Sequence, residues 1–243
     1  MFRATDPALP TLPVAPRAGT PSHAQTQGGG GPRRSADAQA GQALLQGHLT
    51  CLPGARGLVI MACAGGQGPD HAALQQVAGI LHSHWLATLV LDLSHDSAGC
   101  GPAGADPDRL NASLGAALRQ VHEDQRTCRL ASGLMGADGC ATTALNTAAH
   151  HPGWVGAVVS PGGLPDPGAT GLARVQAPTL LIVGGRDPEA LRLNRSAMRG
   201  LRCESRLEVV PGATHPFDEP GALETLAHLA ASWFTDHLGQ PRH

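Results

Sequence analysis

The sequence predicts an α/β protein built on a mostly parallel, doubly wound sheet, and two observations carry this prediction. Short apolar runs, each about the length of a strand, alternate along the chain with longer segments of helical character. These runs are continuously apolar, which is typical of strands that helices cover on both faces. In such sheets, sites form at the carboxyl ends of the strands.

The first half of the chain supplies three of the expected strands. Ala43–Thr50 alternates loosely in polarity and indicates an edge strand, whereas Gly57–Ala62 and Leu86–Asp92 are uniformly apolar and predict buried strands. A helix is expected between the buried strands over Pro69–His84. Its candidate core contacts are Ala72, Val77, Ile80 and Leu81. A loop rich in Gly and Ser follows over Ser94–Asp106, and a further helix is expected over Pro107–Asp124.

The second half of the chain repeats the alternation of strand and helix. An apolar strand begins at Arg129 and leads through a tight turn into an Ala-rich helix. Further strands are expected over Trp154–Ser160, Thr179–Val183 and Ser205–Val210, with helices between them and over Pro220–Leu238. Alternating strands and helices of this length predict one doubly wound layer arrangement.

The length and composition of the chain predict one domain with a tail. Residues 1–41 are rich in Pro, Gly, Ala and Ser without a hydrophobic period, so we expect a disordered arm. The folded domain is expected over residues 42–238, followed by a short tail at 239–243. Hydrophobic residues make up 42% of the sequence but aromatic residues only 2%, so the core must consist mainly of Leu, Val, Ala and Ile.

Charge and cysteine usage exclude several classes of function. A net charge of −2 gives no electrostatic basis for binding nucleic acid or an anionic membrane. No apolar run reaches the ~18 residues of a membrane helix, and the N-terminus lacks the apolar core of a secretory signal. The six cysteines are scattered without a CxxC pair, which favours thiols in a reducing compartment. We therefore expect a cytoplasmic protein.

Neither a metal nor a cofactor is predicted. His82 and His84 lie two residues apart, so on a helix they do not share a face that could hold a metal ion. The Gly-rich segment Gly65–Gly68 follows a strand, but it matches neither a P-loop nor a dinucleotide-binding fingerprint.

A nucleophile elbow is predicted where the strand from Arg129 ends. The segment from Gly136 to Cys140 has the pattern small-x-nucleophile-x-small, in which a sharp turn lifts one side chain above the sheet edge. Ser or Cys usually occupies the central position, but this chain has Asp138. That substitution decides whether the protein is an ordinary esterase, an unusual hydrolase or an inactive one.

Two further residues complete a candidate triad. Asp187 leaves the end of a buried strand, where a carboxylate can accept the Nδ1 proton of a histidine; a helix N-cap before Pro188 is the alternative interpretation. His215 lies in the loop after the last strand, where an imidazole can reach over the elbow; a solvated loop histidine is the alternative. The chain order of elbow, acid and histidine is that of α/β-hydrolases.

With these positions in line, the chain resembles the α/β-hydrolase superfamily and, within it, the dienelactone hydrolase-like branch. The resemblance covers about residues 42–238. It is carried by the segments 54–62, 87–93, the elbow, 157–166, 177–187 and 211–221. It implies an α/β-hydrolase fold without a cap domain and hydrolysis of a small ester, lactone or thioester. Some relatives are joined to a phosphoribosyltransferase domain, which is not contained in this sequence.

The sequence departs from the family pattern at two places. Asp138 replaces the usual Ser or Cys, and relatives have a His-Gly pair where this chain has Cys63 and Ala64. The resemblance implies that the backbone amides of Ala64 and Gly139 form the oxyanion hole, and backbone donors survive changes of side chain. Gly to Ala at position 64 nevertheless narrows the allowed backbone angles.

Three interpretations of the elbow stay open. Asp138 can act as a nucleophile, as in haloalkane dehalogenases and epoxide hydrolases, although Gly139 replaces the dehalogenase Trp and the chain has no Tyr to polarise an epoxide. Cys140 is a second candidate, because a thiolate at a helix N-terminus is activated; a small packing residue is the alternative. In the third interpretation the protein has lost its catalytic activity. A carboxylate beside His215 would hold the imidazole cationic, and a cationic imidazole cannot act as a general base.

We therefore expect a hydrolase acting on a small-molecule substrate, with Asp138, Asp187 and His215 as its catalytic residues. Ser160, which ends a strand, is expected to line the pocket together with Cys63 and Cys140. The different-class alternative is a hydrolase-fold protein that binds a small ligand or a partner. The sequence gives neither the substrate nor the oligomeric state.

Overall fold

The computed structural model describes residues 46–63, 69–93, 106–136, 140–165, 171–215 and 217–239. These residues form a seven-stranded sheet with the order β1-β3-β2-β4-β5-β6-β7. The strands are β1 (Gln46–Thr50), β2 (Gly57–Cys63), β3 (Leu86–Asp92), β4 (Ala131–Gly136), β5 (Val155–Pro161), β6 (Thr179–Gly184) and β7 (Ser205–Val210). Only β1 is antiparallel to its neighbour, so the predicted mostly parallel sheet is confirmed.

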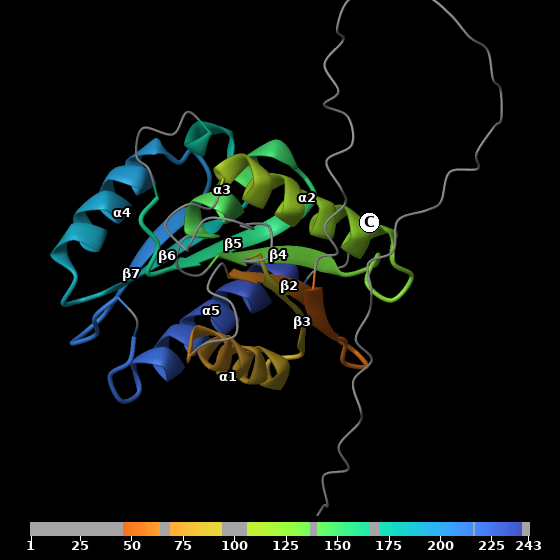
Figure 1. Ribbon diagram of the computed structural model, residues 1–243, viewed down its shortest axis with the longest axis horizontal. Helices are drawn as coiled ribbons and strands as arrows, with labels where there is room; N and C mark the ends of the chain where they lie inside the picture. The colour runs from red at the N-terminus through yellow and green to blue at the C-terminus, as the bar shows by residue number, and fades with distance from the viewer. Residues whose placement is uncertain are drawn as a thin grey trace, which may run out of the picture.

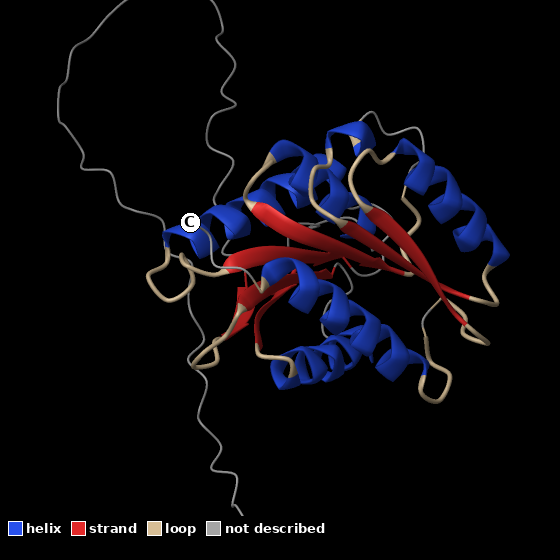
Figure 2. Ribbon diagram, turned by 180° about the vertical axis from the view of Figure 1, so that it is seen from behind, coloured by secondary structure: helices blue, strands red, loops and turns tan. Residues whose placement is uncertain are grey.

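Helices cover the sheet on both faces (Figure 1, and from behind in Figure 2). The helices are α1 (Pro69–Ser83), α2 (Pro107–Glu123), α3 (Ala141–His150), α4 (Pro188–Gly200) and α5 (Ala222–Leu238), with a short 3₁₀ turn η3 at Leu172–Arg174. One apolar cluster joins the sheet to α1 and α5, and a second joins it to α2, α3 and α4. The doubly wound arrangement follows from these two clusters.

The strand order reverses at β2. The chain places β3 on one side of β2 and then β4 on the other, so the helices α1 and α2 that make these two connections lie on opposite faces. Ligands of doubly wound sheets bind in the crevice at such a reversal, outside the carboxyl ends of the strands. The fold therefore directs attention to the ends of β2 and β4, at Cys63 and Gly136.

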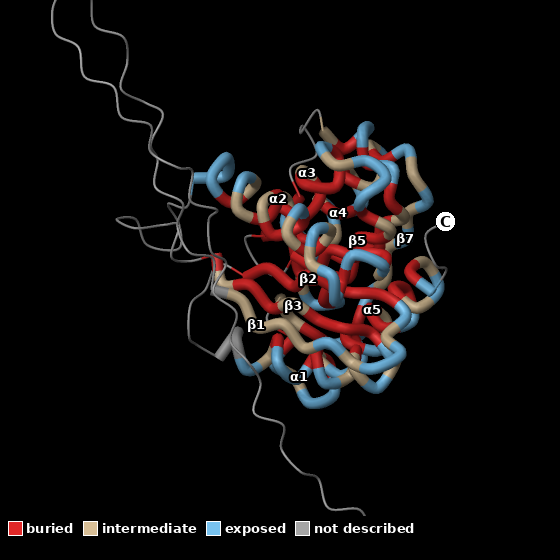
Figure 3. Tube along the Cα trace, turned by 90° about the vertical axis from the view of Figure 1, so that its right-hand side faces the viewer, coloured by how far each residue is buried: buried red, intermediate tan, exposed pale blue. Residues whose placement is uncertain are grey.

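The helix α5 lies directly on the middle of the sheet because three strand glycines leave room for it. A Cβ on Gly133 would lie 2.6 Å from the ring of Phe234, and a Cβ on Gly57 or Gly156 would lie 2.7 or 2.8 Å from Leu238. Phe234 and Leu238 have no exposed surface. Figure 3 shows the resulting buried layer along the central strands.

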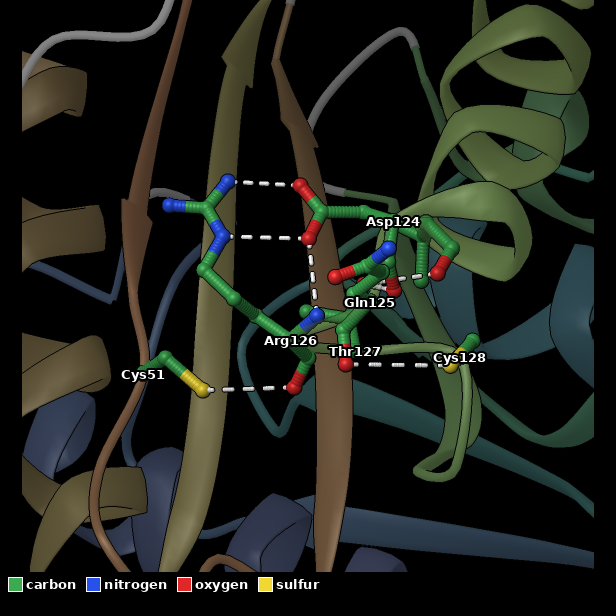
Figure 4. A network of polar contacts seen from close by, with 7 residues as sticks. Cys51, Asp124, Gln125, Arg126, Thr127 and Cys128 are labelled. Carbon is green, nitrogen blue, oxygen red and sulfur yellow. Dashed lines mark hydrogen bonds and ion pairs between the residues drawn. The ribbon is translucent and has the colours of Figure 1, made fainter.

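A polar network lies at the opposite end of the sheet from the strand carboxyl ends, in the turn between α2 and β4 (Figure 4). The guanidinium of Arg126 donates two hydrogen bonds to the Asp124 carboxylate, at 2.6 and 3.0 Å. These bonds lower the pKa of Asp124 below its usual value. The Thr127 hydroxyl donates to the carbonyl of Val121 at 2.6 Å. This network closes the turn.

Several expectations fall on residues outside the described ranges. They are the disordered arm over residues 1–41, most of the loop after β3, and the last part of the tail. Among the residues that are described, no helix is both long and apolar enough to pass through a bilayer.

Candidate active site

The end of β4 lies close against the start of α3. Gly136 ends β4, and Cys140 is the N-cap of α3. A Cβ on Gly136 would collide with the carbonyl oxygen of Cys140 and lie 2.9 Å from the Cβ of Ala144, so glycine is required. Such close approach is what a nucleophile elbow demands of its small positions. Asp138 and Gly139, the predicted nucleophile and oxyanion donor, lie outside the described residues, as does Ala64.

Asp187 follows β6 directly and begins α4, as predicted. Its Oδ1 accepts the backbone N–H of Ala190 at 2.9 Å, and Pro188 occupies the first turn. The interpretation of Asp187 as a helix N-cap is therefore confirmed. Between these two described side chains, no hydrogen bond joins the Asp187 carboxylate to the His215 imidazole. The role of Asp187 in orienting His215 stays a prediction.

His215 lies in the loop after β7, which is held by a carboxylate and by a buried ring. The backbone N–H of Thr214 donates to both oxygens of the Glu219 carboxylate at 3.0 Å, and this hydrogen bond lowers the pKa of Glu219 below its usual value. Phe217 has a φ of +57°, which non-glycine residues rarely adopt. Its side chain is 5% exposed, so its burial offsets the strain of that backbone conformation.

Backbone hydrogen bonds join the loop of His215 to the loop of Asp187. The N–H of Gly185 donates to the carbonyl of Val210 at 2.9 Å, and the N–H of Arg186 donates to the carbonyl of Ala213 at 2.8 Å. A Cβ on Gly184 would lie 2.5 Å from the Ala213 carbonyl oxygen, so the two loops are in direct contact. The loops that carry the candidate acid, Asp187, and the candidate base, His215, are therefore held against each other.

The imidazole of His215 rests on the turn after β5. Gly162 in this turn has a φ of +60°, and a Cβ there would lie 3.5 Å from Nε2 of His215 and 3.2 Å from the ring of Phe217. The N–H of Gly162 donates to the carbonyl of Ile182 at 2.8 Å. Since β5 neighbours β4, Nε2 of His215 lies one strand away from the strand that ends at Gly136. The carboxyl ends of β4 to β7 thus bring Gly136, His215 and Asp187 to the same edge of the sheet.

The three residues that were expected to line the pocket have buried side chains. Ser160 is 0% exposed, and among the described residues its Oγ has no hydrogen-bond partner. Cys140 is 0% exposed, and Cys63 is 1% exposed with its Sγ 3.5 Å from the carbonyl of Leu91. Contact of these three with a ligand stays a prediction. No group of three His, Cys, Asp or Glu that could hold a metal occurs in the described part of the chain.

Sequence reasoning missed two residues near this surface. Asn194 is a buried residue of α4 whose side chain donates to the carbonyl of Gly163 at 2.7 Å. The sequence contains a signal for Asn194. Helical spacing places it on the same apolar face as Ala190 and Ala197, and it is the polar residue of the three. Glu219, which holds the His215 loop, gives no comparable signal in the sequence.

A solved structure shows the family of the chain. No model of a known protein family matches it. The dienelactone hydrolase of Anabaena variabilis is 35% identical, with a TM-score of 0.75, and the match covers 82% of this chain and 94% of that one. The chain belongs to the dienelactone hydrolase family of α/β-hydrolase-fold proteins. The predicted α/β-hydrolase fold is thereby confirmed.

More distant structures share the fold alone. Est1E from Butyrivibrio proteoclasticus is 12% identical with a TM-score of 0.67, and the match covers 81% of this chain and 96% of that one. An esterase domain from Rhodothermus marinus is 15% identical with a TM-score of 0.64, and here the match covers 80% and 94%.

The curated relatives are longer than this chain. Two proteins from strains of Mycobacterium tuberculosis, which carry the provisional name of phosphoribosyl transferase, are 40% identical over 203 residues. The match covers 83% of this chain but 46% of those proteins, so the chain spans about half the length of the curated relatives it matches.

Proposed function

We propose that the chain hydrolyses a small ester, lactone or thioester. In this proposal Asp138 holds the nucleophile position, His215 is the general base and Asp187 orients it, while the amides of Ala64 and Gly139 stabilise the developing oxyanion. The observation that carries the proposal is the position of His215: its Nε2 lies against Gly162, in the turn after β5, and β5 neighbours β4, the strand that ends at Gly136.

The family supports the proposal of a hydrolase. The most informative relative is the one whose length the match covers almost completely. The Anabaena protein is called a dienelactone hydrolase, and the match covers 94% of it. The transferase name belongs to proteins of which the chain spans 46%, so it does not guide the proposal. We also propose that the substrate is a small molecule, that neither nucleic acid nor a membrane is a partner, and that the protein is cytoplasmic. Cys51, Cys128 and Cys203 are free thiols, which supports the last of these.

The proposed reaction has two steps. The Asp138 carboxylate attacks the acyl carbon of the substrate, and the alcohol or thiol is displaced as its anion, which takes a proton from solvent; the acyl group stays on Asp138 as a mixed anhydride. A water that gives its proton to Nε2 of His215 then attacks the Asp138 carboxyl carbon, the anhydride C–O bond breaks, and the acyl group leaves as the product carboxylate. The second step places one oxygen from water on Asp138, which makes the step traceable by isotope.

Hydrolysis of short p-nitrophenyl esters tests the proposal. We expect turnover by the wild type that His215→Ala abolishes, and loss of turnover in Asp138→Asn if the carboxylate attacks. Removal of a residue of such a catalytic unit lowers kcat by about 10⁴-fold or more. A single turnover in ¹⁸O water should label the Asp138 peptide, as seen by mass spectrometry. Unlabelled Asp138 in an active enzyme would contradict the attack of water on the Asp138 carboxyl carbon.

A non-catalytic ligand-binding protein is the second candidate, and one observation favours it. Oδ1 of Asp187 accepts the N–H of Ala190, and no hydrogen bond joins the described side chains of Asp187 and His215. The wild type would then show no turnover above His215→Ala. Esterase activity that appears in Asp138→Ser would indicate that only the nucleophile was lost.

A further inference from the structure

The buried amide of Asn194 connects α4 to the turn on which His215 rests. Asn194 is 0% exposed, and its Nδ2 donates to the carbonyls of Gly163 and Ala190 at 2.7 and 2.8 Å. A buried polar side chain is costly unless it is hydrogen-bonded, and here one bond reaches a residue 31 positions earlier in the chain. An apolar side chain could fill this buried position without the cost of burying a polar group. What asparagine adds is therefore the hydrogen bond to Gly163.

The same helix turn also holds the candidate acid. The N–H of Ala190 donates to Oδ1 of Asp187 at 2.9 Å, and the carbonyl of Ala190 accepts from Asn194 at 2.8 Å. Asp187, Ala190, Asn194 and Gly163 therefore form a continuous series of hydrogen bonds. Through this series the first two turns of α4 fix the acid and the turn after β5 relative to each other.

The turn that Asn194 holds is in contact with both the candidate base and the start of α3. A Cβ on Gly162 would lie 3.5 Å from Nε2 of His215, and a Cβ on Gly163 would collide with Ala141, the first residue of α3. The same Cβ on Gly163 would lie 2.6 Å from Oγ of Ser160, so Gly163 is tightly packed. A shift of this turn would therefore move His215 relative to the start of α3.

We propose that Asn194 is a positioning residue of this site: by holding the carbonyl of Gly163 it sets the distance between Nε2 of His215 and Ala141, the first residue of α3. Its effect on turnover rests on the proposed hydrolase function, whereas its effect on the His215 imidazole does not. Asn194 reaches no reacting atom itself, because its side chain is fully buried. Its contribution is geometric, and misplacement by about 1 Å can reduce turnover by about 100-fold.

Replacement of Asn194 by Leu removes both donors at similar volume. We expect kcat for p-nitrophenyl acetate to fall by about 10- to 100-fold while KM changes little. In Asn194→Asp, the protonated carboxyl can donate to Gly163 and the carboxylate cannot. The kcat of N194D relative to wild type should therefore fall as pH rises, and this pH profile is not expected from a general loss of stability.

Thr179→Val is the matched control. It removes a buried bond of the same kind, from Thr179 Oγ1 to the Ala177 carbonyl at 3.0 Å, but at the amino end of β6. The loss of stability should be comparable to that in Asn194→Leu, without loss of kcat. If both variants lose kcat equally, Asn194 has only a structural role and the proposal is wrong.

The imidazole ¹⁵N resonances of His215, assigned with His215→Gln, give a measure that needs no activity. We expect Asn194→Leu to shift or broaden them and Thr179→Val to leave them unchanged. Resonances that match the wild type in a folded Asn194→Leu protein, or in Asn194→Asp with its carboxyl ionised, would overturn the proposal. Absence of turnover in the wild type would count against the hydrolase function, while the resonances would still decide the role of Asn194. If the Leu variant does not fold, the Asp variant carries the test.

Discussion

At the scale of single residues, the placement of His215 depends on its immediate neighbours in the chain. Thr214 is held by the carboxylate of Glu219, and Phe217 keeps a left-handed backbone conformation because its ring is buried. Neither neighbour is a candidate for chemistry. Together they determine where the loop passes over Gly162 and hence where the imidazole lies.

Glu219→Gln tests the carboxylate that holds this loop. Hydrogen bonding by Thr214 lowers the pKa of Glu219 in the folded state, so its contribution to stability is present above the usual pKa of about 4.5 and is lost as pH falls through the lowered folded value. The wild type should therefore exceed the variant in urea midpoint at pH 7, and this difference should shrink in acid. A difference that persists unchanged at pH 3 would contradict this account.

At the scale of elements, the close contact between α5 and the sheet requires glycine at three strand positions. Gly133 faces the ring of Phe234, and Gly57 and Gly156 face Leu238. At these positions only the side chains of the helix lie between helix and strand. The helix therefore sits close to the strands that lead toward the site.

Gly133→Ala should destabilise the protein. The added Cβ would lie 2.6 Å from the Phe234 ring, which is fully buried, and overpacking of this kind costs about 1–3 kcal/mol. Gly79→Ala, on exposed surface of α1 with no atom within 4 Å of the new Cβ, is the control and should stabilise by about 0.5–1 kcal/mol. Urea unfolding of both variants checks the opposite signs, and equal effects would refute the packing argument.

At the scale of the whole molecule, both helical layers contain a histidine that resists protonation. Burial, and then the charge of His48, lowers the pKa of His82 on α1; burial, and then the charge of Arg119, lowers the pKa of His151 after α3. His82 also shares a hydrogen bond of 2.8 Å with Thr88 of β3. Protonation of either histidine thus opposes folding.

The free energy of unfolding should fall as pH drops from 7.5 to 5. A histidine with a lowered folded pKa binds fewer protons when folded than when unfolded, so stability is complete above the unfolded pKa of about 6.5 and declines below it. Urea midpoints at both pH values should show this decline, and the double variant His82→Gln, His151→Gln should show a weaker one. An equal decline in the variant would assign the effect to other groups.

The arrangement of strands could be predicted from the sequence, because strands covered on both faces are continuous apolar runs. The predicted strand over Leu86–Asp92 has the observed bounds of β3, whereas Gly57–Ala62 differs from β2 by one residue at one end and Trp154–Ser160 differs from β5 by one residue at each end. Asp187 also occupies its predicted place. Its hydrogen bond to Ala190, and the bond from Asn194 to Gly163, depend on how α4 settles against β5. The spacing of residue types along the sequence does not predict such contacts.

The order of the elements has a consequence for synthesis on the ribosome. Residues 222–238 form α5, which covers β2, β4 and β5, yet they emerge after every strand of the sheet. At about 5–20 residues per second, some ten seconds or more separate the appearance of β2 from that of the helix that shields it. During that interval the nascent chain exposes an apolar sheet face, which makes it a target for the chaperones that bind unfinished proteins.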